Sequence, residues 1–435
     1  MKWSRYNYLF EGEGKYFIYN SLSNSFIELE HDIFKELKMC KENNEMKISD
    51  AKLKEQLIRM KIFVDDDRDE LNKIKYKVQK KRFSDNFLNL TINPTLNCNF
   101  ACPYCFEGNE HPNISMSDKV EDEIIDYIKK HKNAKSLRVT WFGGEPLLAF
   151  NRIVSLTNRM KDLNLSYNAG IITNGYLFTE KMIRELPSLC IKKIQITIDG
   201  SEKLHDSRRC LKSGKGTFQK IVNNITLLQK LTPEIKVIIR VNSDETNRDE
   251  YIKIVNFFKE KKFPNLFVSP GFVNDVSDCN QSDCIFNRAK KVKFILDMHK
   301  EYGIYFPYFY PLSNRYECSV RNHNVIVIGP KGEIYKCWND VGNARKIVGY
   351  LNGKIENENL LIRYLNGADP FDSEECKKCI LLPVCEGGCP SMRIEREYEN
   401  KDIDVCSLLK DNMEDFLLIH YHHKLKEASI LDCNK

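Results

Sequence analysis

The stretch Cys98-Asn-Phe-Ala-Cys102-Pro-Tyr-Cys105 decides the fold, because three cysteines at CxxxCxxC spacing follow directly on a strand-like run. In that run, residues 88–93, Leu and Ile alternate with Asn and Thr. Three thiolates can hold one face of a cubane iron–sulfur cluster and leave one iron without a protein ligand, which predicts chemistry as well as electron storage. A zinc loop usually supplies four ligands and a redox thiol pair needs a single CxxC, so both alternatives fit this spacing poorly.

The spacing, with Tyr104 just before the last cysteine, resembles the signature of the radical S-adenosylmethionine (radical SAM) enzymes. The resemblance implies that Cys98, Cys102 and Cys105 hold a 4Fe-4S cluster, that SAM completes the fourth iron, and that Tyr104 packs near the adenine. Reduction would then cleave SAM and release a 5'-deoxyadenosyl radical, which abstracts a hydrogen atom from a substrate.

Composition limits the class of protein. A chain of 435 residues with 42% hydrophobic residues can form two or three domains. The net charge of +6 is small for this length and gives no nucleic-acid signature. No apolar run reaches the roughly 18 residues of a membrane span, and no apolar signal core follows Met1, so we expect a cytoplasmic protein without a membrane partner. In that reducing compartment, sixteen cysteines favour cluster ligation over disulfides.

Residues 1–85 have the pattern of a separate domain. Short aromatic-rich runs predict an antiparallel meander, at 6–10, 16–19 and 25–29. Apolar residues at helical spacing then predict two helices, through 33–37 and 53–60. The combination resembles the winged-helix-like peptide-recognition domain of many peptide-modifying radical SAM enzymes, which implies that a leader peptide binds as an added strand at a sheet edge. The alternative is a cap that only packs on the barrel.

Six basic residues lie between Lys73 and Arg82. Because Ile74, Tyr76 and Val78 alternate with lysines there, the segment could be a strand. We expect a solvated connection between domains instead.

From residue 88 to about 273, strand-like and helix-like stretches alternate. The strand-like stretches are short and rich in Ile and Val, at 137–142, 169–173, 191–198, 235–241 and 266–269. Repeated strand–helix units predict a parallel sheet closed or partly closed as a barrel, with the active site at the carboxyl ends of its strands. The three cysteines follow the first strand, where this rule places functional residues.

Polar motifs follow the later strands. Gly143-Gly144-Glu145 follows the second strand, and two glycines before a carboxylate allow a close approach of backbone to ligand. The resemblance implies that this GGE motif holds the SAM amino group and that the later strand ends contact the rest of SAM. The SAM contacts it implies are Tyr104, Gly143, Gly144, Glu145, Thr173, Asn174, Thr197, Asp199, Arg209, Arg240 and Asn242. No catalytic base is assigned.

After the fourth strand, the sequence His205-Asp-Ser-Arg-Arg209 is followed by Gly216-Thr-Phe218. This resembles the HDxxR…GTF pattern of the peptide-modifying and sulfatase-modifying branch, with Arg209 at the matched position. The alternative for Asp206, Arg208 and Arg209 is an ordinary charged turn.

Seven cysteines in the C-terminal third have the spacing of a SPASM extension, a domain that binds two auxiliary 4Fe-4S clusters. By position, the resemblance assigns Cys318, Cys337 and Cys389 to auxiliary cluster I, and Cys376, Cys379, Cys385 and Cys406 to auxiliary cluster II. Cluster I is one ligand short, so it has an open iron or another ligand, with Cys279 or Cys284 as weak candidates. A run with Met413, Phe416 and Leu417 predicts a closing helix.

The sequence therefore predicts an α/β protein with three domains. They are a winged-helix-like leader-recognition domain (1–85), a partial (β/α)6 TIM-like radical SAM barrel (86–310) and a SPASM domain with a closing helix (311–435). We expect a maturase that cross-links residues of a ribosomally made precursor peptide, using three 4Fe-4S clusters, SAM and an external flavodoxin or ferredoxin as electron donor.

Two alternatives remain. A sulfatase-maturating enzyme usually lacks the long N-terminal domain and carries an Asp after the second SPASM cysteine, where this chain has Trp338. A non-catalytic iron–sulfur carrier, or a zinc-structured binding protein, would have no need for Gly143-Gly144-Glu145 or Arg240.

Overall fold

The computed structural model describes residues 1–105, 112–272, 286–307, 310 and 318–433. The chain divides into two compact units, each built from separate segments. The first unit contains Met1–Arg82, Arg288–Cys318 and Asn366–Lys435, and the second contains Phe83–Asn287 and Ser319–Leu365. The division into three domains that the sequence predicts, 1–85, 86–310 and 311–435, remains a proposal.

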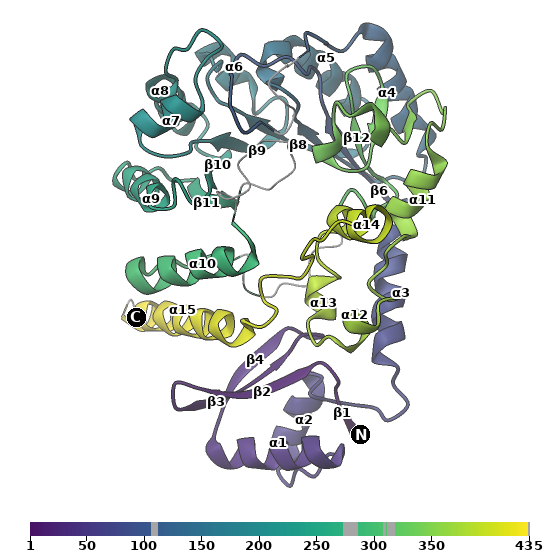
Figure 1. Ribbon diagram of the computed structural model, residues 1–435, viewed down its shortest axis with the longest axis vertical. Helices are drawn as coiled ribbons and strands as arrows, with labels where there is room; N and C mark the ends of the chain where they lie inside the picture. Colours follow the sequence, from purple (N-terminus) through teal and green to yellow (C-terminus); the bar gives the residue numbers. More distant parts are fainter. Residues whose placement is uncertain (106–111, 273–285, 308–309, 311–317, 434–435) are drawn as a thin grey trace. The chain divides into compact units, whose positions relative to one another are not determined.

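The second unit is built on a nine-stranded sheet of order β11-β10-β9-β8-β7-β6-β12-β13-β14 (Figure 1). Neighbouring strands from β6 to β11 are parallel, which confirms the predicted strand–helix units. Their bounds are Phe87–Ile92 (β6), Ser136–Trp141 (β7), Ser166–Thr173 (β8), Ile191–Thr197 (β9), Lys236–Ser243 (β10) and Leu266–Phe272 (β11). Buried Ile and Val side chains hold these strands together, and in β8 and β10 they alternate with partly exposed residues, so one face of the sheet is more deeply buried than the other.

Three further strands extend this sheet beyond the six predicted ones. Strand β12 (Val325–Ile328) pairs in parallel with β6 and continues antiparallel into β13 (Glu333–Tyr335) and β14 (Gly349–Tyr350). Residues of the predicted SPASM range therefore belong to the same sheet as β6, the strand that precedes the three cysteines.

Helices connect the parallel strands. Helix α4 (Asp118–Lys130) is capped by Ser117, whose side chain accepts a hydrogen bond from the Val120 amide. The other helices of this sheet are α5 (Phe150–Lys161), α6 (Glu180–Glu185), α7 (Glu202–Arg208), α8 (Phe218–Leu231) and α9 (Glu250–Glu260), with α11 (Glu358–Asn366) after β14. Short 3-10 turns occupy Pro146–Ala149, Trp338–Asp340 and Ala344–Lys346.

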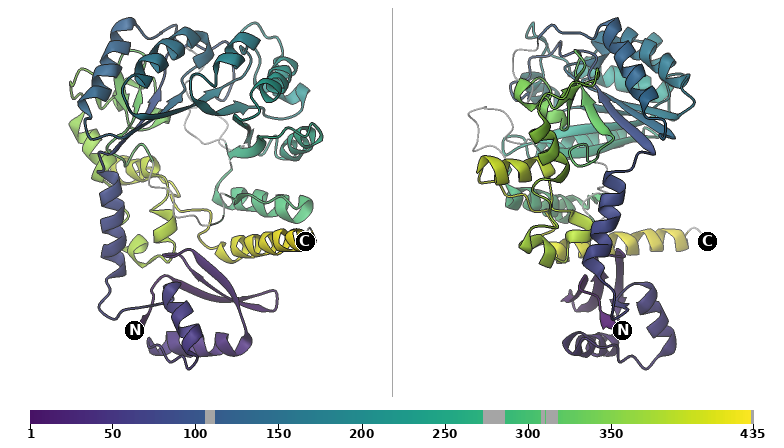
Figure 2. Two further views of the ribbon diagram at one scale, coloured as in Figure 1. Left: turned by 180° about the vertical axis from the view of Figure 1, so that it is seen from behind. Right: turned by 90° about the vertical axis from the view of Figure 1, so that its right-hand side faces the viewer.

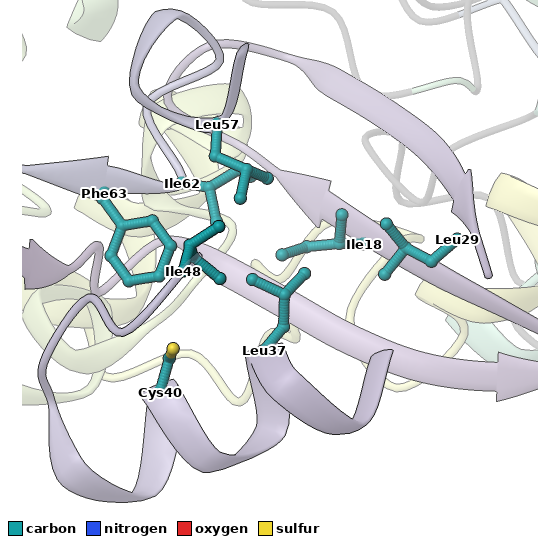
Figure 3. Packing of buried hydrophobic residues seen from close by; sticks show 8 residues of the cluster. All are labelled: Ile18, Leu29, Leu37, Cys40, Ile48, Leu57, Ile62 and Phe63. Carbon is teal, nitrogen blue, oxygen red and sulfur yellow. The ribbon is translucent and has the colours of Figure 1, made fainter. Parts of the chain in front are cut away.

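The first unit begins with the predicted meander, a three-stranded antiparallel sheet of order β2-β3-β4. Its elements are β1 (Lys2–Trp3), β2 (Asn7–Gly12), β3 (Lys15–Asn20), β4 (Ser25–Leu29), α1 (His31–Asn43), α2 (Ala51–Arg59) and β5 (Phe63–Val64). Ile18 and Leu29 from the sheet pack against Leu37 of α1 and Leu57 of α2 in one apolar core (Figure 3). Helices on one face of a small sheet give the expected winged-helix-like organisation.

The strand alternative for residues 73–82 was wrong, because they belong to helix α3 (Glu70–Arg82). Ile74 and Val78 are four residues apart and both are buried, whereas Tyr76 between them is 63% exposed. A spacing of four fits a helix face as well as it fits alternation, and the apolar partners Tyr6 and Leu382 favour the helix. Arg82 at its end forms a buried ion pair with Asp369 at 2.6 Å.

The closing helix α15 (Met413–Cys433) is present and contacts strand β2 of the meander (Figure 2). The Tyr8 hydroxyl donates to Glu414 at 2.5 Å, and the Tyr421 ring lies 5.1 Å from that of Phe17. The remaining helices of this unit are α10 (Arg288–Tyr302), α12 (Glu374–Lys378), α13 (Leu382–Cys385) and α14 (Pro390–Glu399). In the described ranges, no helix is both long and apolar enough to cross a membrane.

Candidate SAM and cluster site

Residues 98–105, which carry the three cysteines and are called the cluster loop below, come after β6. Backbone hydrogen bonds hold this loop to the segment after α7. The Ala101 amide donates to the Cys210 carbonyl at 3.0 Å, and the Lys212 amide donates to the Asn99 carbonyl at 3.1 Å. Cys98 and Cys102 are buried and Cys105 is partly buried. Burial raises the pKa of the Cys98 thiol to about 12. Burial also raises the pKa of Cys102, while the nearby Arg209 cation acts in the opposite direction.

The two glycines after β7 let this turn approach the residues just ahead of Cys98. A Cβ on Gly143, whose φ is +108°, would lie 2.4 Å from the Thr95 carbonyl oxygen. A Cβ on Gly144 would lie 2.4 Å from the carbonyl oxygens of Leu96 and Asn97. The sequence predicted that these glycines let the backbone approach a ligand. They also let the GGE turn pack directly against the backbone just before the cluster loop.

Glu145 is fully buried and joins the ends of two strands. Its carboxylate accepts hydrogen bonds from the Thr173 hydroxyl at 2.6 Å, the Asn174 amide at 2.7 Å and the Leu147 amide at 3.0 Å. Burial raises the pKa of Glu145, while these donors oppose the rise by favouring the ionised form. The Asn174 side chain in turn donates to Asn99 in the cluster loop at 2.8 Å. Strand ends β7 and β8 therefore meet beside the cysteines.

A second group forms around the Tyr104 hydroxyl. It donates to Asp199 after β9, and it accepts from Arg209 Nη1 at 2.7 Å and from Asn242 Nδ2 on β10 at 3.5 Å. The Arg208 guanidinium lies 4.9 Å from the centre of the Tyr104 ring and donates to Asp199 at 3.3 Å. Burial raises the pKa of Tyr104, so its hydroxyl stays protonated. The site thus assembles four of the predicted SAM contacts around the cluster loop.

The HDxxR…GTF pattern acts as a clamp behind Arg209. Asp206 Oδ1 accepts from the amides of Thr217 and Phe218 at 2.7 and 2.9 Å, at the start of α8. A Cβ on Gly216 would lie 2.1 Å from the Asp206 carboxylate, so any other residue there would displace that carboxylate. Thr217 donates to the Arg209 carbonyl at 2.7 Å. The alternative of an ordinary charged turn does not describe these contacts.

His205 completes the clamp as a neutral side chain. Its Nδ1 faces the Asp199 amide at 3.3 Å and its Nε2 faces the Thr217 hydroxyl at 3.0 Å. Because the hydroxyl donates to Arg209 and the amide is a donor, the imidazole carries its proton on Nε2. Burial lowers its pKa to about 3.

Arg240 and Thr197 face each other on β10 and β9. Arg240 Nε donates to Asn242 Oδ1 at 2.8 Å, and burial lowers its pKa. Its guanidinium lies over Gly271 of β11, where a Cβ would be 2.4 Å from the guanidinium carbon. Gly271 was not predicted, although a glycine in a strand marks such a close approach.

Several buried polar atoms of this site have no hydrogen-bond partner within the described residues, among them Asp199 Oδ1, Arg209 Nε and Asn99 Nδ2. Buried polar groups are nearly always paired, so atoms left over beside three cysteines fit a polar ligand with donors and acceptors of its own. SAM has an amino group, a carboxylate and ribose hydroxyls, so the donor set fits it.

Trp338 follows Cys337 and is 47% exposed. Its ring centre lies 5.9 Å from that of Phe142, the residue before Gly143. Asp340 at the end of the same turn is buried and accepts from Tyr364 at 2.7 Å. The exposed Trp338, packed on the partly buried Phe142, therefore stands where sulfatase-maturating enzymes are expected to have a carboxylate.

In the first unit, one cavity of about 330 Å³ is lined by all four cysteines proposed for auxiliary cluster II, Cys376, Cys379, Cys385 and Cys406. Basic side chains surround them, because Arg393 Nη1 lies 3.5 Å from the Cys376 sulfur and Lys410 Nζ lies 3.5 Å from the Cys406 sulfur. Cations beside thiolates offset the negative charge that a thiolate-ligated cluster brings into a partly buried site.

Two glycines shape this cavity. Gly387 and Gly388, with φ of +85° and +79°, lie between Cys385 and Cys389. A Cβ on Gly388 would stand 1.8 Å from the Val405 carbonyl oxygen, directly before Cys406. Their role, and that of Arg393, was missed in the sequence, although a glycine pair between two cysteines is a detectable signal.

The ligands proposed for auxiliary cluster I are divided between the units. Cys318 and Cys389 belong to the first unit and Cys337 to the second. Cys279 and Cys284 lie outside the described residues. Within those residues, no three His, Cys, Asp or Glu side chains converge on one metal-ion position.

Comparison with known proteins identifies the central domain. Residues 92–270 match the Radical SAM superfamily. The chain therefore contains a radical SAM domain, and its cysteine-rich C-terminal part fits a radical SAM/SPASM enzyme. This family uses a 4Fe-4S cluster and SAM.

Two curated relatives are a cysteine-type anaerobic sulfatase-maturating enzyme of Clostridium novyi and the radical SAM cyclopropyl synthase TigE of Paramaledivibacter caminithermalis. The first is 25% identical over 69% of this chain and 87% of its own length. The second is 25% identical over 72% of this chain and 70% of its own length.

Among solved structures, anSMEcpe with bound AdoMet has a TM-score of 0.62 at 20% identity and covers 79% of this chain and 100% of its own. Streptococcus suis SuiB bound to its precursor peptide SuiA has a TM-score of 0.53 at 18% identity and covers 93% of this chain and 99% of its own. The shared fold is the partial radical SAM barrel that the sequence predicts.

Proposed function

We propose that this protein is a maturase of a ribosomally synthesised precursor peptide, which it binds through the leader. The observation that carries the proposal is the N-terminal meander. The fold likeness to SuiB, which was solved with its precursor peptide, extends over 93% of this chain, whereas the likeness to anSMEcpe extends over 79%. Outer strand β4 pairs only with β3 among the described strands, so its other edge can take an extended peptide.

In this proposal, Cys98, Cys102 and Cys105 hold the radical-generating cluster, which with SAM supplies the hydrogen-abstracting radical. Glu145 offers a carboxylate for the SAM amino group, held in place by Thr173 and Asn174. The clamp of His205 and Asp206 fixes Arg209 against the cluster loop. Four further proposed SAM contacts, Thr197, Asp199, Arg240 and Asn242, lie on or just after β9 and β10.

The SPASM cysteines hold two auxiliary clusters in this proposal, giving three in total. The four-cysteine cavity with Arg393 and Lys410 would hold one of them, and a reduced flavodoxin or ferredoxin would supply electrons from outside. The auxiliary clusters accept the electron left after the substrate carbon radical has formed its new bond.

Sulfatase maturation is the second candidate, because the curated relatives include enzymes of that name. It requires a base near the substrate cysteine or serine. The exposed Trp338 on Phe142 offers an apolar surface in place of a carboxylate, which favours the peptide maturase.

The test is anaerobic reconstitution followed by incubation with SAM, a strong reductant and the precursor peptide encoded beside the gene. The proposal expects about twelve irons per chain, formation of 5'-deoxyadenosine and a mass loss of the peptide that requires its leader. SAM cleavage with an unmodified precursor, together with formylglycine in a sulfatase peptide, would establish the second candidate instead.

A further inference from the structure

We propose that Tyr104 is a positioning residue whose hydroxyl latches the cluster loop to the ends of β9 and β10 and so orients Asp199 and Arg209 toward SAM. The inference deepens the proposed function and rests on its SAM site. It assigns to the side chain a role apart from the adenine packing that the sequence resemblance implies.

Three chain segments meet at this one hydroxyl. Tyr104 lies between Cys102 and Cys105, Asp199 follows β9, and Asn242 lies on β10. Its one proton goes to Asp199, and its oxygen accepts from Arg209. A phenylalanine would keep the ring over which Arg208 lies and would lose all of these hydrogen bonds.

The latch leaves defined atoms for a ligand. Asp199 Oδ2 is held by Tyr104 and Arg208, so the carboxylate cannot rotate freely. Within the described residues, its Oδ1 is buried and without a hydrogen-bond partner, and so is Nε of Arg209, whose Nη1 is taken by Tyr104. An acceptor and a charged donor thus belong to two side chains that the same hydroxyl holds, which suits a hydroxyl and a carboxylate of SAM.

Arg209 has two further contacts that keep it near the cluster loop when the latch is lost. Its carbonyl accepts from Thr217, and its guanidinium carbon lies 5.7 Å from the ring centre of Phe100 in the cluster loop. Arg208 is likewise held by Asp244 at 2.7 Å. The Tyr104 hydroxyl therefore connects the cluster loop to this network, and a substitution by phenylalanine removes it without removing the ring.

The experiment uses the reconstituted holoenzyme with the Tyr104→Phe substitution and no peptide. We expect the same iron content as wild type, because the three cysteines remain. We expect SAM binding weakened roughly tenfold or more, as for loss of a hydrogen bond to charged groups. The KM for SAM in 5'-deoxyadenosine formation should rise more than kcat falls, and SAM should perturb the EPR spectrum of the reduced cluster less.

Tyr167→Phe is the matched control, because it removes a hydroxyl bonded to Thr157 at 3.3 Å in the same domain. It should leave SAM binding and the EPR response unchanged. A Tyr104→Phe enzyme with wild-type SAM affinity and EPR response would overturn the proposal.

A double-mutant cycle with Asp199→Asn tests whether Tyr104 acts through Asp199. We expect the double variant to bind SAM no more weakly than the weaker single variant, whereas additive losses would contradict the latch. Wild-type enzyme that cleaves SAM and leaves the precursor unmodified would contradict the peptide maturase alone, since this test measures SAM without peptide.

Discussion

Gly388 and Val405 are in backbone contact, so close that a Cβ on Gly388 would stand 1.8 Å from the Val405 carbonyl oxygen. This contact sets the Cys385–Cys389 turn beside Cys406 and closes the four-cysteine cavity. The cavity therefore depends on the absence of one side chain.

Gly388→Ala should cost the protein about four of its irons, because either the turn or the segment at Val405 must move. The loss should fall on the cluster proposed for the four-cysteine cavity, since the cysteines proposed for the SAM-binding cluster lie in the other unit. Iron analysis and Mössbauer spectroscopy measure it. The control is Gly353→Ala, where φ is +93° and no described atom lies within 4 Å of the added Cβ, so only the backbone strain is shared. Equal iron in both variants would contradict this role of the contact.

The buried His205 should make the apoprotein sensitive to acid. Its pKa is lowered to about 3 in the folded state, against 6.5 as the ordinary value. The neutral form is therefore favoured by folding, so the stabilisation is complete above pH 6.5 and is lost as the pH falls toward 3. Between pH 7.5 and 5, this group alone should lower the free energy of unfolding by about 2 kcal/mol.

Urea unfolding at several pH values checks this expectation. His205→Gln cannot take up the proton, so that part of the pH dependence should disappear. His131→Gln at the end of α4 should keep it. An unchanged pH slope in His205→Gln would show that the imidazole does not titrate on unfolding.

The fold was readable from the sequence because its signals are local. Short runs rich in Ile and Val predicted the parallel strands, and each run coincides with a strand of the sheet. The strand alternative for 73–82 arose because Ile74 and Val78 fit two periods at once, and only the distant partner Leu382 decides between them. Pairing of β12 with β6 was also beyond reach, since it joins residues more than 230 positions apart.

The candidate site was predictable in its motifs and not in its contacts. The pattern around Arg209 was recognised, yet the reason for Gly216 is the carboxylate of Asp206, which only three-dimensional packing reveals. Arg208 was weighed as a charged turn, and the structure places it between Asp199 and Asp244. No sequence period reports such side-chain pairs.

Thr173→Val should destabilise the apoprotein by about 1.5–3 kcal/mol, because Glu145 loses a hydrogen bond to its buried carboxylate. Valine keeps the shape of the side chain and the strand propensity. Thr140→Val on the neighbouring strand β7 is the control, and it should change stability by much less. Denaturant unfolding measures both, and equal effects would show that the Thr173 hydroxyl contributes little.

Lys336→Met should destabilise the second unit. The ammonium of Lys336 is 1% exposed and donates to the carbonyls of Asn322 and Val325 at 2.6 Å each. Methionine fills a similar volume and leaves buried acceptors without these donors, at a cost of about 2–5 kcal/mol. The exposed Lys331→Met is the control. Hydrogen exchange at β12 should rise in Lys336→Met, and unchanged exchange there would contradict the expected role.

The contact between β2 and α15 has a consequence for biosynthesis. Tyr8 and its partner Glu414 are 406 positions apart, so the meander leaves the ribosome long before the helix that packs on it. During that interval the nascent sheet lacks its contacts with α15, because Tyr421, which packs against Phe17, has not yet been synthesised. The domain that we propose for leader recognition therefore reaches its final form only after the cysteines of every proposed cluster have been synthesised. We expect the leader peptide to bind to the completed chain and not to the nascent one.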